Sequence, residues 1–183
     1  MTAAGCSQES PSSATTAAAS PEASPYLVTS TIQDIMQSVV DPNADALWES
    51  VATISDEHGV TEKQPRTPEE WLEVRHKAIA VIEGANLLVM PGRRVVAEGK
   101  TLEDADVEGI LKPDEIQKLL ETERATFIER AHGLHSAATA VLTAIDAKNA
   151  QALSDAGGAL DEACEACHVK FWYPNQPVPG EKK

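Results

Sequence analysis

One stretch near the C-terminus decides how the whole chain is interpreted: Cys164-Glu165-Ala166-Cys167-His168, followed by Val169-Lys170-Phe171-Trp172-Tyr173-Pro174. It has the form C-x-x-C-H, which is the attachment signature of a c-type haem. In that chemistry the two thiols form thioether bonds to the porphyrin vinyl groups, and the adjacent histidine gives an axial nitrogen to the iron. Positions i, i+3 and i+4 of a helix lie on one face. Cys164, Cys167 and His168 can therefore bind one flat ligand from a single helix.

Two other chemistries also use closely spaced cysteines. A thioredoxin-like C-x-x-C places its first cysteine at a helix N-terminus, where the helix dipole lowers the thiol pKa. Cys164 instead comes late in a long helical pattern. A structural zinc site takes four protein ligands, and the motif supplies three. Haem attachment is therefore the favoured interpretation, with a chance occurrence of the pattern as the remaining alternative.

The composition restricts the class of protein. The chain has 183 residues, enough for one ordinary domain plus additional segments. Its formal net charge of −14 argues against nucleic acid as a partner and suits a basic protein partner. No apolar run approaches the length of a membrane span. Aromatic residues make up only 4% of the chain, which favours closely packed helices.

The first 25 residues are expected to lie outside the folded domain. Residues 7–25 are rich in Ser, Ala, Thr and Pro and have no apolar periodicity, which predicts a disordered linker. Small residues precede Cys6, as at the end of a bacterial lipoprotein signal, although the charged and hydrophobic parts of such a signal are missing. We interpret residues 1–6 as the remnant of a signal and Cys6 as a lipid anchor, with an incidental thiol as the alternative.

The first helix is expected to begin near Ser30. Its apolar residues recur at the i, i+3, i+4, i+7 and i+8 positions that line one face of a helix: Ile32, Ile35, Met36, Val39 and Val40. Asp41-Pro42 follows and is expected to interrupt this helix. Asp41 can then cap a second, short helix with Pro42 at its first position.

Three longer helical segments follow. The second helix of the bundle, which follows the short helix after Asp41, has a clear start at Thr67-Pro68-Glu69-Glu70. This stretch supplies an N-cap, a proline at the first helical position and a capping-box glutamate. Residues 113–147 hold the helical period throughout and predict a third helix. The fourth begins near Asn149, contains the C-x-x-C-H motif and stops before Pro174.

Four amphipathic helices without a convincing strand predict an all-α protein. We expect an antiparallel up-down-up-down four-helix bundle over residues 26–174, with the haem-attachment motif near its C-terminal end and an irregular tail over residues 175–183. Residues 55–66 are polar and carry Gly59 and Pro65, which predicts a loop. Residues 93–112 form a connection that is long for a bundle, and we expect it to cover the haem edge.

The last helix is similar to that of a known family. The segment Ala159-Leu160-Asp161-Glu162-Ala163-Cys164-Glu165-Ala166-Cys167-His168-Val169-Lys170-Phe171 resembles the terminal helix of the cytochrome c-prime superfamily. The likeness covers residues 26–172, where outside the motif it rests on helix order more than on matching residues. The resemblance implies a four-helix bundle with one covalent haem c, held by Cys164, Cys167 and His168. It also implies haem attachment in the periplasm of a Gram-negative bacterium.

Members of this superfamily differ in what the first helix presents to the far face of the iron. A bulky apolar residue leaves the iron five-coordinate and able to bind NO or CO, whereas a methionine makes it six-coordinate and low-spin. The matching stretch here is Ile32-Gln33-Asp34-Ile35-Met36, so the resemblance implies Met36 as the distal iron ligand. The alternative is that Met36 fills space in the core, as buried methionines usually do. Met90 is expected nearer the haem edge.

Two positions depart from the pattern of the five-coordinate members. Those proteins usually carry a basic residue four positions after the proximal histidine, where this chain has Trp172. They commonly carry an arginine four positions before the distal residue, where this chain has Ile32. The first difference argues against gas chemistry on the proximal face. The second means that the haem propionates need another cation, for which Arg93 and Arg94 are candidates, although solvated loop charges are the favoured interpretation of both.

Four other histidines compete for the role of iron ligand. His58 belongs to the polar loop, and His76 falls between two charged residues. His132 and His135 lie midway along the third helical segment. Each is interpreted as a surface histidine or one whose hydrogen bonds are satisfied within the fold.

The favoured function is electron transfer. A periplasmic mono-haem cytochrome would carry single electrons to and from redox partner proteins and would catalyse no reaction, so it is not an enzyme. A five-coordinate haem protein that binds NO or CO is the alternative. A peroxidase would need a distal acid–base pair, which we do not identify. Superfamily members often form homodimers through their first helices, but the Asp41-Pro42 interruption leaves a homodimer open here.

Overall fold

The structure is a computed structural model that describes Met1, residues 25–57 and residues 59–176. It is mostly helical, which confirms the predicted helical class. Cys6, nearly all of the predicted linker, His58 and residues 177–183 lie outside the described residues. Of the helices in this part of the chain, none combines the length and the apolar character that crossing a lipid bilayer would require.

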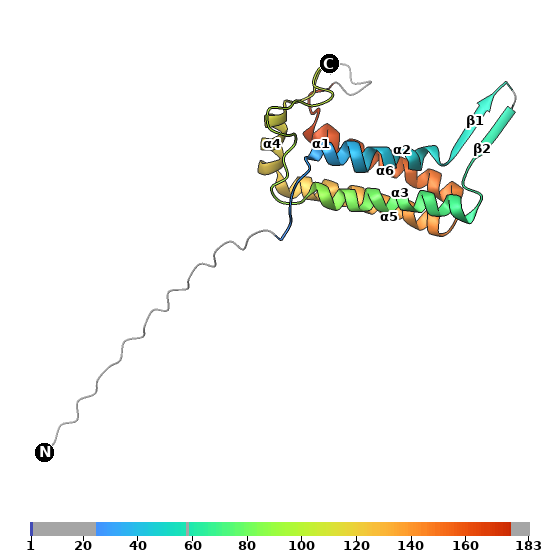
Figure 1. Cartoon of the computed structure of the whole chain (residues 1–183), viewed down its shortest axis with the longest axis horizontal. Coiled ribbons are helices and arrows are strands. Elements are labelled where there is room, and N and C mark those ends of the chain that lie inside the picture. The colour runs from blue at the N-terminus through green and yellow to red at the C-terminus, as the bar shows by residue number, and fades with distance from the viewer. Residues whose placement is uncertain (2–24, 58, 177–183) are drawn as a thin grey trace.

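The helices are α1 (Ile32–Ile35), the π-helix η1 (Met36–Val40), α2 (Asp41–Glu49), α3 (Pro68–Leu88), α4 (Pro113–Thr122), α5 (Arg124–Asp146) and α6 (Ala150–Phe171). The first three follow one another without a gap and form one composite helix. The composite helix packs on α3, α3 packs on α5, and α5 packs on α6, which also contacts α2. These long elements run side by side and make up the body of the molecule (Figure 1).

One cluster of apolar side chains fills the space between the helices and draws on all of them. Its members lie at helical spacing along each element, as the sequence predicts. The rings of Phe127 in α5 and Phe171 in α6 meet edge to face, with centroids 5.7 Å apart. The largest fully buried side chains are Phe171, Leu47, Ile116, Leu153, Leu160, Val40, Val81, Val95 and Val141.

The predicted interruption at Asp41-Pro42 is wrong. The helix continues through both residues, and Asp41 has helical dihedral angles (φ −58°, ψ −53°) instead of capping a new helix. In a regular α-helix Pro42 would lack its hydrogen bond to Ser38, and its ring would collide with the Ser38 carbonyl group. The wider turn of η1, in which the Asp41 amide donates to the Met36 carbonyl group, accommodates the proline without a break.

The wider turn also keeps the apolar side chains on one face. The buried residues of the composite helix are Ile32, Ile35, Val40, Ala44 and Leu47. In a regular α-helix Val40 would lie at the edge of this face and Val39 nearer its centre. The extra residue in the π turn moves Val40 into the core, where it is fully buried, and leaves Val39 only partly buried.

The loop predicted for residues 55–66 is wrong as well. The chain forms an antiparallel hairpin of β1 (Ala52–Asp56) and β2 (Gly59–Lys63). Gly59 has φ +123°, a backbone conformation that favours glycine. The hairpin projects from one end of the molecule (Figure 1), and even Ile54 is half exposed. Because neither face of the hairpin is buried, its sequence lacks the alternating pattern from which a strand is predicted.

The third predicted helix is divided in two at Glu123, which has non-helical dihedral angles (φ −111°, ψ 36°). α4 lies across the end of the other helices, whereas α5 runs along them (Figure 1). Lys170 forms an ion pair with Glu123 (Nζ–Oε2 2.7 Å), and the Arg124 guanidinium donates to the carbonyl group of Val89. Neither proline nor glycine stands at the bend, so contacts with other elements override the helical period here.

Two of the predicted helix starts are confirmed. The Thr67 hydroxyl accepts from the Glu70 amide (3.2 Å), and the Glu70 carboxylate accepts from the Thr67 amide (3.0 Å) at the start of α3. The side chain of Asn149 accepts from the Ala152 amide (3.0 Å) at the start of α6. Because these caps fix the first turn of each helix, they also fix which residues each helix presents to the core.

Gly84 of α3 allows η1 to approach closely. A Cβ atom at this position would lie 2.8 Å from Cγ2 of Val40, which is fully buried and β-branched. We expect Gly84→Ala to lower the free energy of unfolding by about 1 kcal/mol, because overpacking outweighs the gain in helix propensity.

The matched control is Gly133→Ala in α5, where no heavy atom lies within 4 Å of the added Cβ. This exposed substitution should stabilise the protein by up to about 1 kcal/mol, since only helix propensity changes. Denaturant unfolding measures both variants. Equal effects at the two glycines would contradict the close approach of η1 to α3.

Candidate functional site

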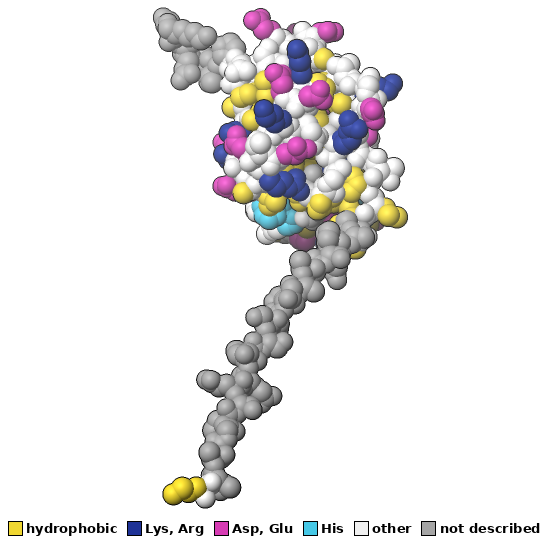
Figure 2. Space-filling view, turned by 90° about the vertical axis from the view of Figure 1, so that its left-hand side faces the viewer, with side chains coloured by type: hydrophobic (Ala, Val, Ile, Leu, Met, Phe, Trp, Pro, Cys, Tyr) yellow, Lys and Arg dark blue, Asp and Glu magenta, His cyan; other side chains and the backbone are white. Residues whose placement is uncertain are grey.

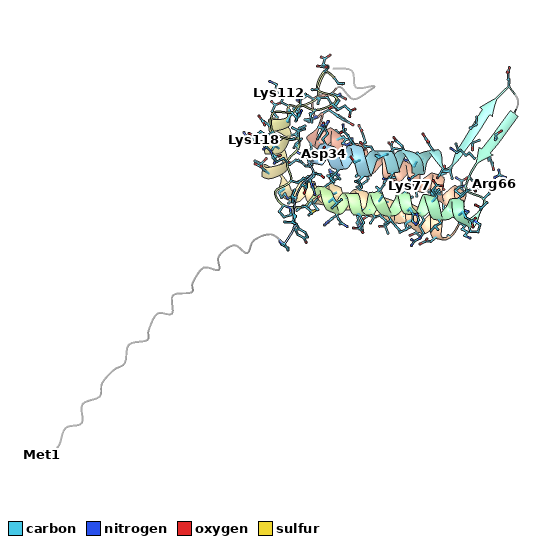
Figure 3. The ribbon with its side chains drawn as sticks, in the orientation of Figure 1. Met1, Asp34, Arg66, Lys77, Lys112 and Lys118 are labelled. Carbon is cyan, nitrogen blue, oxygen red and sulfur yellow. The ribbon has the colours of Figure 1, made fainter. Side chains whose placement is uncertain are left out.

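A cavity lies between the start of the composite helix and the end of α6, at the end of the molecule where Asp34, Lys112 and Lys118 are labelled in Figure 3. Its volume is about 290 Å³, near the lower end of the range for ligand and cofactor sites. Most of its lining is apolar. The lining residues are Ile32, Gln33, Met36, Gln37, Asp41, Leu88, Glu103, Asp104, Ile116, Leu120, Phe127, Cys167, His168, Phe171, Trp172 and Tyr173.

Three of the four predicted site residues meet at this cavity: Met36 from η1, and Cys167 and His168 from α6. Cys164 lies one turn earlier on α6, where it is half-buried and packs against the core without lining the cavity. The whole C-x-x-C-H motif falls inside α6. The two cysteines and the histidine therefore have the one-sided helical spacing that the sequence predicts.

The end of α6 surrounds His168 with aromatic side chains. The amides of Trp172 and Tyr173 both donate to the His168 carbonyl group, at 2.7 and 3.0 Å. The ring centroids of Trp172 and Tyr173 lie 6.5 and 6.0 Å from the imidazole centroid. The Tyr173 hydroxyl also donates to Glu165 Oε2 (2.5 Å). These contacts hold both aromatic residues beside the imidazole.

Both thiols of the motif are free, and burial keeps them protonated. Burial, followed by the charges of Asp41 and Asp161, raises the pKa of Cys164 to about 12. Burial, partly opposed by the charge of Arg130, raises the pKa of Cys167 to about 11. Such thiols are weak nucleophiles at neutral pH, unlike the thiolates of thioredoxin-like sites. The pair therefore does not fit that redox chemistry.

His168 is held in its neutral form. Burial lowers its pKa, while the charges of Glu165 and Asp104 act in the opposite direction. A neutral imidazole keeps a nitrogen lone pair that a metal ion can bind. At neutral pH His168 can therefore serve as a metal ligand without first losing a proton.

Arg93 and Arg94, the candidate partners of the haem propionates, lie outside the cavity lining. The Arg93 guanidinium is buried (8% exposed) and donates to the Leu87 carbonyl group (2.8 Å) and to Met90 Sδ (3.3 Å). Arg94 pairs at the surface with Glu98 (Nη1–Oε2 3.7 Å). Arg93 therefore satisfies a carbonyl group at the end of α3, and the expectation that it is a solvated loop charge is wrong.

The remaining histidines within the described part of the chain are also remote from the cavity. His76 and His132 are exposed, and His135 is half-buried. None of the three lines the cavity. His76 and His132 therefore lie at the surface, as the sequence predicts.

Sequence reasoning missed the acidic side chains of the cavity. Asp41, Glu103 and Asp104 line it, and no lysine or arginine of the described residues does. Glu103 and Asp104 belong to the connection that is expected to cover this region, but nothing in the sequence singles them out. Acidic residues are frequent throughout a chain with 29 Asp and Glu residues, so a short acidic run carries little information.

The donor atoms at the cavity are of two kinds, neutral groups and carboxylates. No group of three or more His, Cys, Asp or Glu side chains placed to bind a metal ion occurs within residues 25–57 and 59–176. The cavity offers one imidazole, one thioether and one thiol in a mainly apolar wall, together with the carboxylates of Asp41, Glu103 and Asp104. The imidazole and the thioether fit a group that brings further metal ligands of its own.

Comparisons with known proteins found no family model, no curated protein and no solved structure that matches this chain. Its function therefore has to be inferred from the motif and from the geometry of the cavity.

Asp41 provides a pH-dependent test of the cavity. Loss of hydration, followed by the charges of Asp45 and Glu103, raises its pKa from 3.8 to about 6. Between these values the folded protein binds more protons than the unfolded chain, so ionisation of Asp41 lowers the free energy of unfolding as pH rises.

Asp41→Asn removes this ionisation. We expect the variant to become more stable relative to the wild type as pH rises from about 4 to about 7. Denaturant unfolding of both proteins across that range measures the difference. A difference that stays constant with pH would show that Asp41 is not held at a raised pKa.

Proposed function

We propose that this chain is a mono-haem c-type cytochrome similar to the cytochrome c-prime superfamily, that it carries single electrons, and that it is not an enzyme. The observation that carries the proposal is the cavity that collects Cys167, His168 and Met36 from opposite ends of the sequence. If the C-x-x-C-H pattern occurred by chance, an apolar cavity beside it would not be expected. A methionine in the lining of that cavity would not be expected either. Covalent haem attachment accounts for all three features.

The arrangement of helices supports an up-down-up-down four-helix bundle. In chain order its members would be the composite helix, α3, α5 and α6, with α4 and the hairpin as additions. The connection between α5 and α6 spans residues 147–149, so these helices run antiparallel. The proposed haem would then lie between the first and last helices, at the end that α4 covers.

The residues of α6 have defined roles in this proposal. Cys164 and Cys167 would form the two thioether bonds, and His168 would bind the iron through its neutral imidazole. When bound, haem supplies the one-electron Fe(II)/Fe(III) couple, and a histidine–methionine ligand pair favours the reduced state. The aromatic rings of Trp172 and Tyr173 would exclude water from the side of His168.

Met36 would supply the sixth iron ligand. It is half-buried and borders the open volume of the cavity, whereas its neighbour Ile35 is buried in the core. Met36 also packs against the core cluster, so part of its side chain fills space there. Its place in the cavity lining supports the role of ligand.

Binding of NO or CO to a five-coordinate iron is the second candidate function. The side chains of Gln33 and Gln37 line the same cavity as Met36. Hydrogen-bond donors on the distal side stabilise a bound diatomic molecule. This function requires that Met36 leave the iron free, which separates it experimentally from electron transfer.

The proposed setting is the periplasm, with Cys6 as a lipid anchor and redox proteins as partners. The net charge of −14 supports a basic partner and argues against nucleic acid. The end face of the molecule shown in Figure 2 carries lysine and arginine side chains interspersed with acidic ones, so it does not present a field of one sign. The proposal leaves homodimer formation open.

The haem content of the purified protein tests the proposal directly. We expect a pyridine haemochrome assay to find one haem per chain, retained after denaturation because the bonds are covalent. The variant with both Cys164→Ser and Cys167→Ser should lose the covalent haem. A wild-type protein without haem, after expression with a c-type maturation system, would overturn the proposal.

Met36→Ala distinguishes the two candidate functions. For an electron carrier we expect the wild type to be low-spin, and its reduced form to bind CO slowly if at all, because Met36 occupies the sixth position. The variant should be high-spin and bind CO promptly. Met90→Ala is the matched control, since Met90 does not line the cavity. A high-spin wild type, or a spectrum indifferent to Met36→Ala, would favour gas binding instead.

A further inference from the structure

Two adjacent residues of the long connection, Glu103 and Asp104, are bonded to opposite walls of the cavity. The Glu103 amide donates to Gln33 Oε1 (3.0 Å), and its carboxylate accepts from the side-chain amide of Gln37. Both glutamines belong to the composite helix. Asp104 Oδ2 accepts from the indole Nε1–H of Trp172 (3.0 Å), which directly follows α6. The dipeptide therefore links the first helix to the end of the last.

Trp172 binds the same connection a second time. Its carbonyl group accepts from the Leu111 amide (2.9 Å), while its own amide donates to the His168 carbonyl group (2.7 Å). Gln176 adds a third bond by donating through Nε2 to the Glu108 carbonyl group (3.1 Å). Residues 104–111 are thus fastened to the chain segment that carries His168.

The two walls have little other contact at this end. α1 and η1 pack mainly on α3, whereas α6 packs mainly on α5. The cavity occupies the space between η1 and the end of α6. Direct helix-to-helix packing across the cavity is therefore sparse, and the connection supplies hydrogen bonds to both walls.

We infer that Glu103 and Asp104 form a brace that sets the width of the cavity and positions Met36 and His168 relative to one another. The inference rests on the proposed function in that the group between these two residues would be haem. All of the braced side chains, Gln33, Gln37 and Trp172, line the cavity themselves. Loss of either half of the brace frees one wall from the other.

The brace is tested by removing its Asp104–Trp172 half in the full-length purified protein. Asp104→Leu removes the acceptor, and Trp172→Phe removes the donor while keeping an aromatic ring. Asp104→Asn retains a side-chain oxygen acceptor and should rescue the contact. Trp48→Phe is the matched control, because it removes an indole hydrogen bond of similar length (2.9 Å, to the Gly157 carbonyl group) at the other end of the composite helix.

Hydrogen–deuterium exchange reports the brace whether or not haem is bound. We expect the Leu111 amide and its neighbours in residues 103–111 to exchange about fivefold to tenfold faster in Asp104→Leu and Trp172→Phe, as the net loss of one partly exposed hydrogen bond implies. Asp104→Asn and Trp48→Phe should leave this segment protected. Unchanged exchange in Asp104→Leu would overturn the inference.

CO binding to the reduced protein reports the positioning role. We expect Asp104→Leu and Trp172→Phe to bind CO at least about fivefold faster than the wild type, because a looser gap weakens the bond to Met36. Faster exchange with unchanged CO binding would show that the connection only stabilises the fold, and would overturn the positioning role. A wild-type protein without haem would overturn the proposed function instead. Hydrogen–deuterium exchange alone would then show whether the brace exists.

Discussion

The missing amide hydrogen of Pro42 is the constraint on which the first helix depends. A regular α-helix has no place for this proline, and a break would have separated Met36 from the segment that follows it. The π turn of η1 accommodates the proline, keeps the helix continuous and buries Val40 fully in the core. Gly84 makes the turn possible from the other side, since a side chain there would collide with Val40. The wall of the cavity that carries Met36 rests on this pair of residues.

Two kinds of side chain meet at the cavity: some are kept neutral by burial, and others carry a charge. Cys167 and His168 line the cavity, lose hydration and are held as a thiol and a neutral imidazole. Asp104 belongs to the opposite class, because its carboxylate is bound by the Trp172 indole and acts on His168 through its charge. Neutral donors therefore lie inside, and charged acceptors fasten the chain segments around them.

Local chemistry explains what the sequence could predict. The caps at Thr67 and Asn149 lie next to the residues they bind, so a short stretch of sequence contains both partners. The spacing of Met36 from the apolar residues of the first helix predicted that it faces the other helices, whereas its place opposite His168 was implied by the family resemblance. The bend at Glu123 was missed because Lys170, which holds it, is distant in sequence. The hairpin was missed because no buried face marks its strands, and the π turn because a proline in a helical pattern usually signals a break.

The exposed hairpin offers an attachment point that is remote from the cavity. β1 and β2 leave the body at the end opposite the cavity (Figure 1), and their side chains contribute nothing to the core. A surface linkage or a fused reporter introduced in these strands would leave the walls of the cavity and its brace untouched. Molecules immobilised through the hairpin on an electrode or a sensor chip would all face the solution with the same end. Their orientation would be set by the fold, without any change to the helices that form the site.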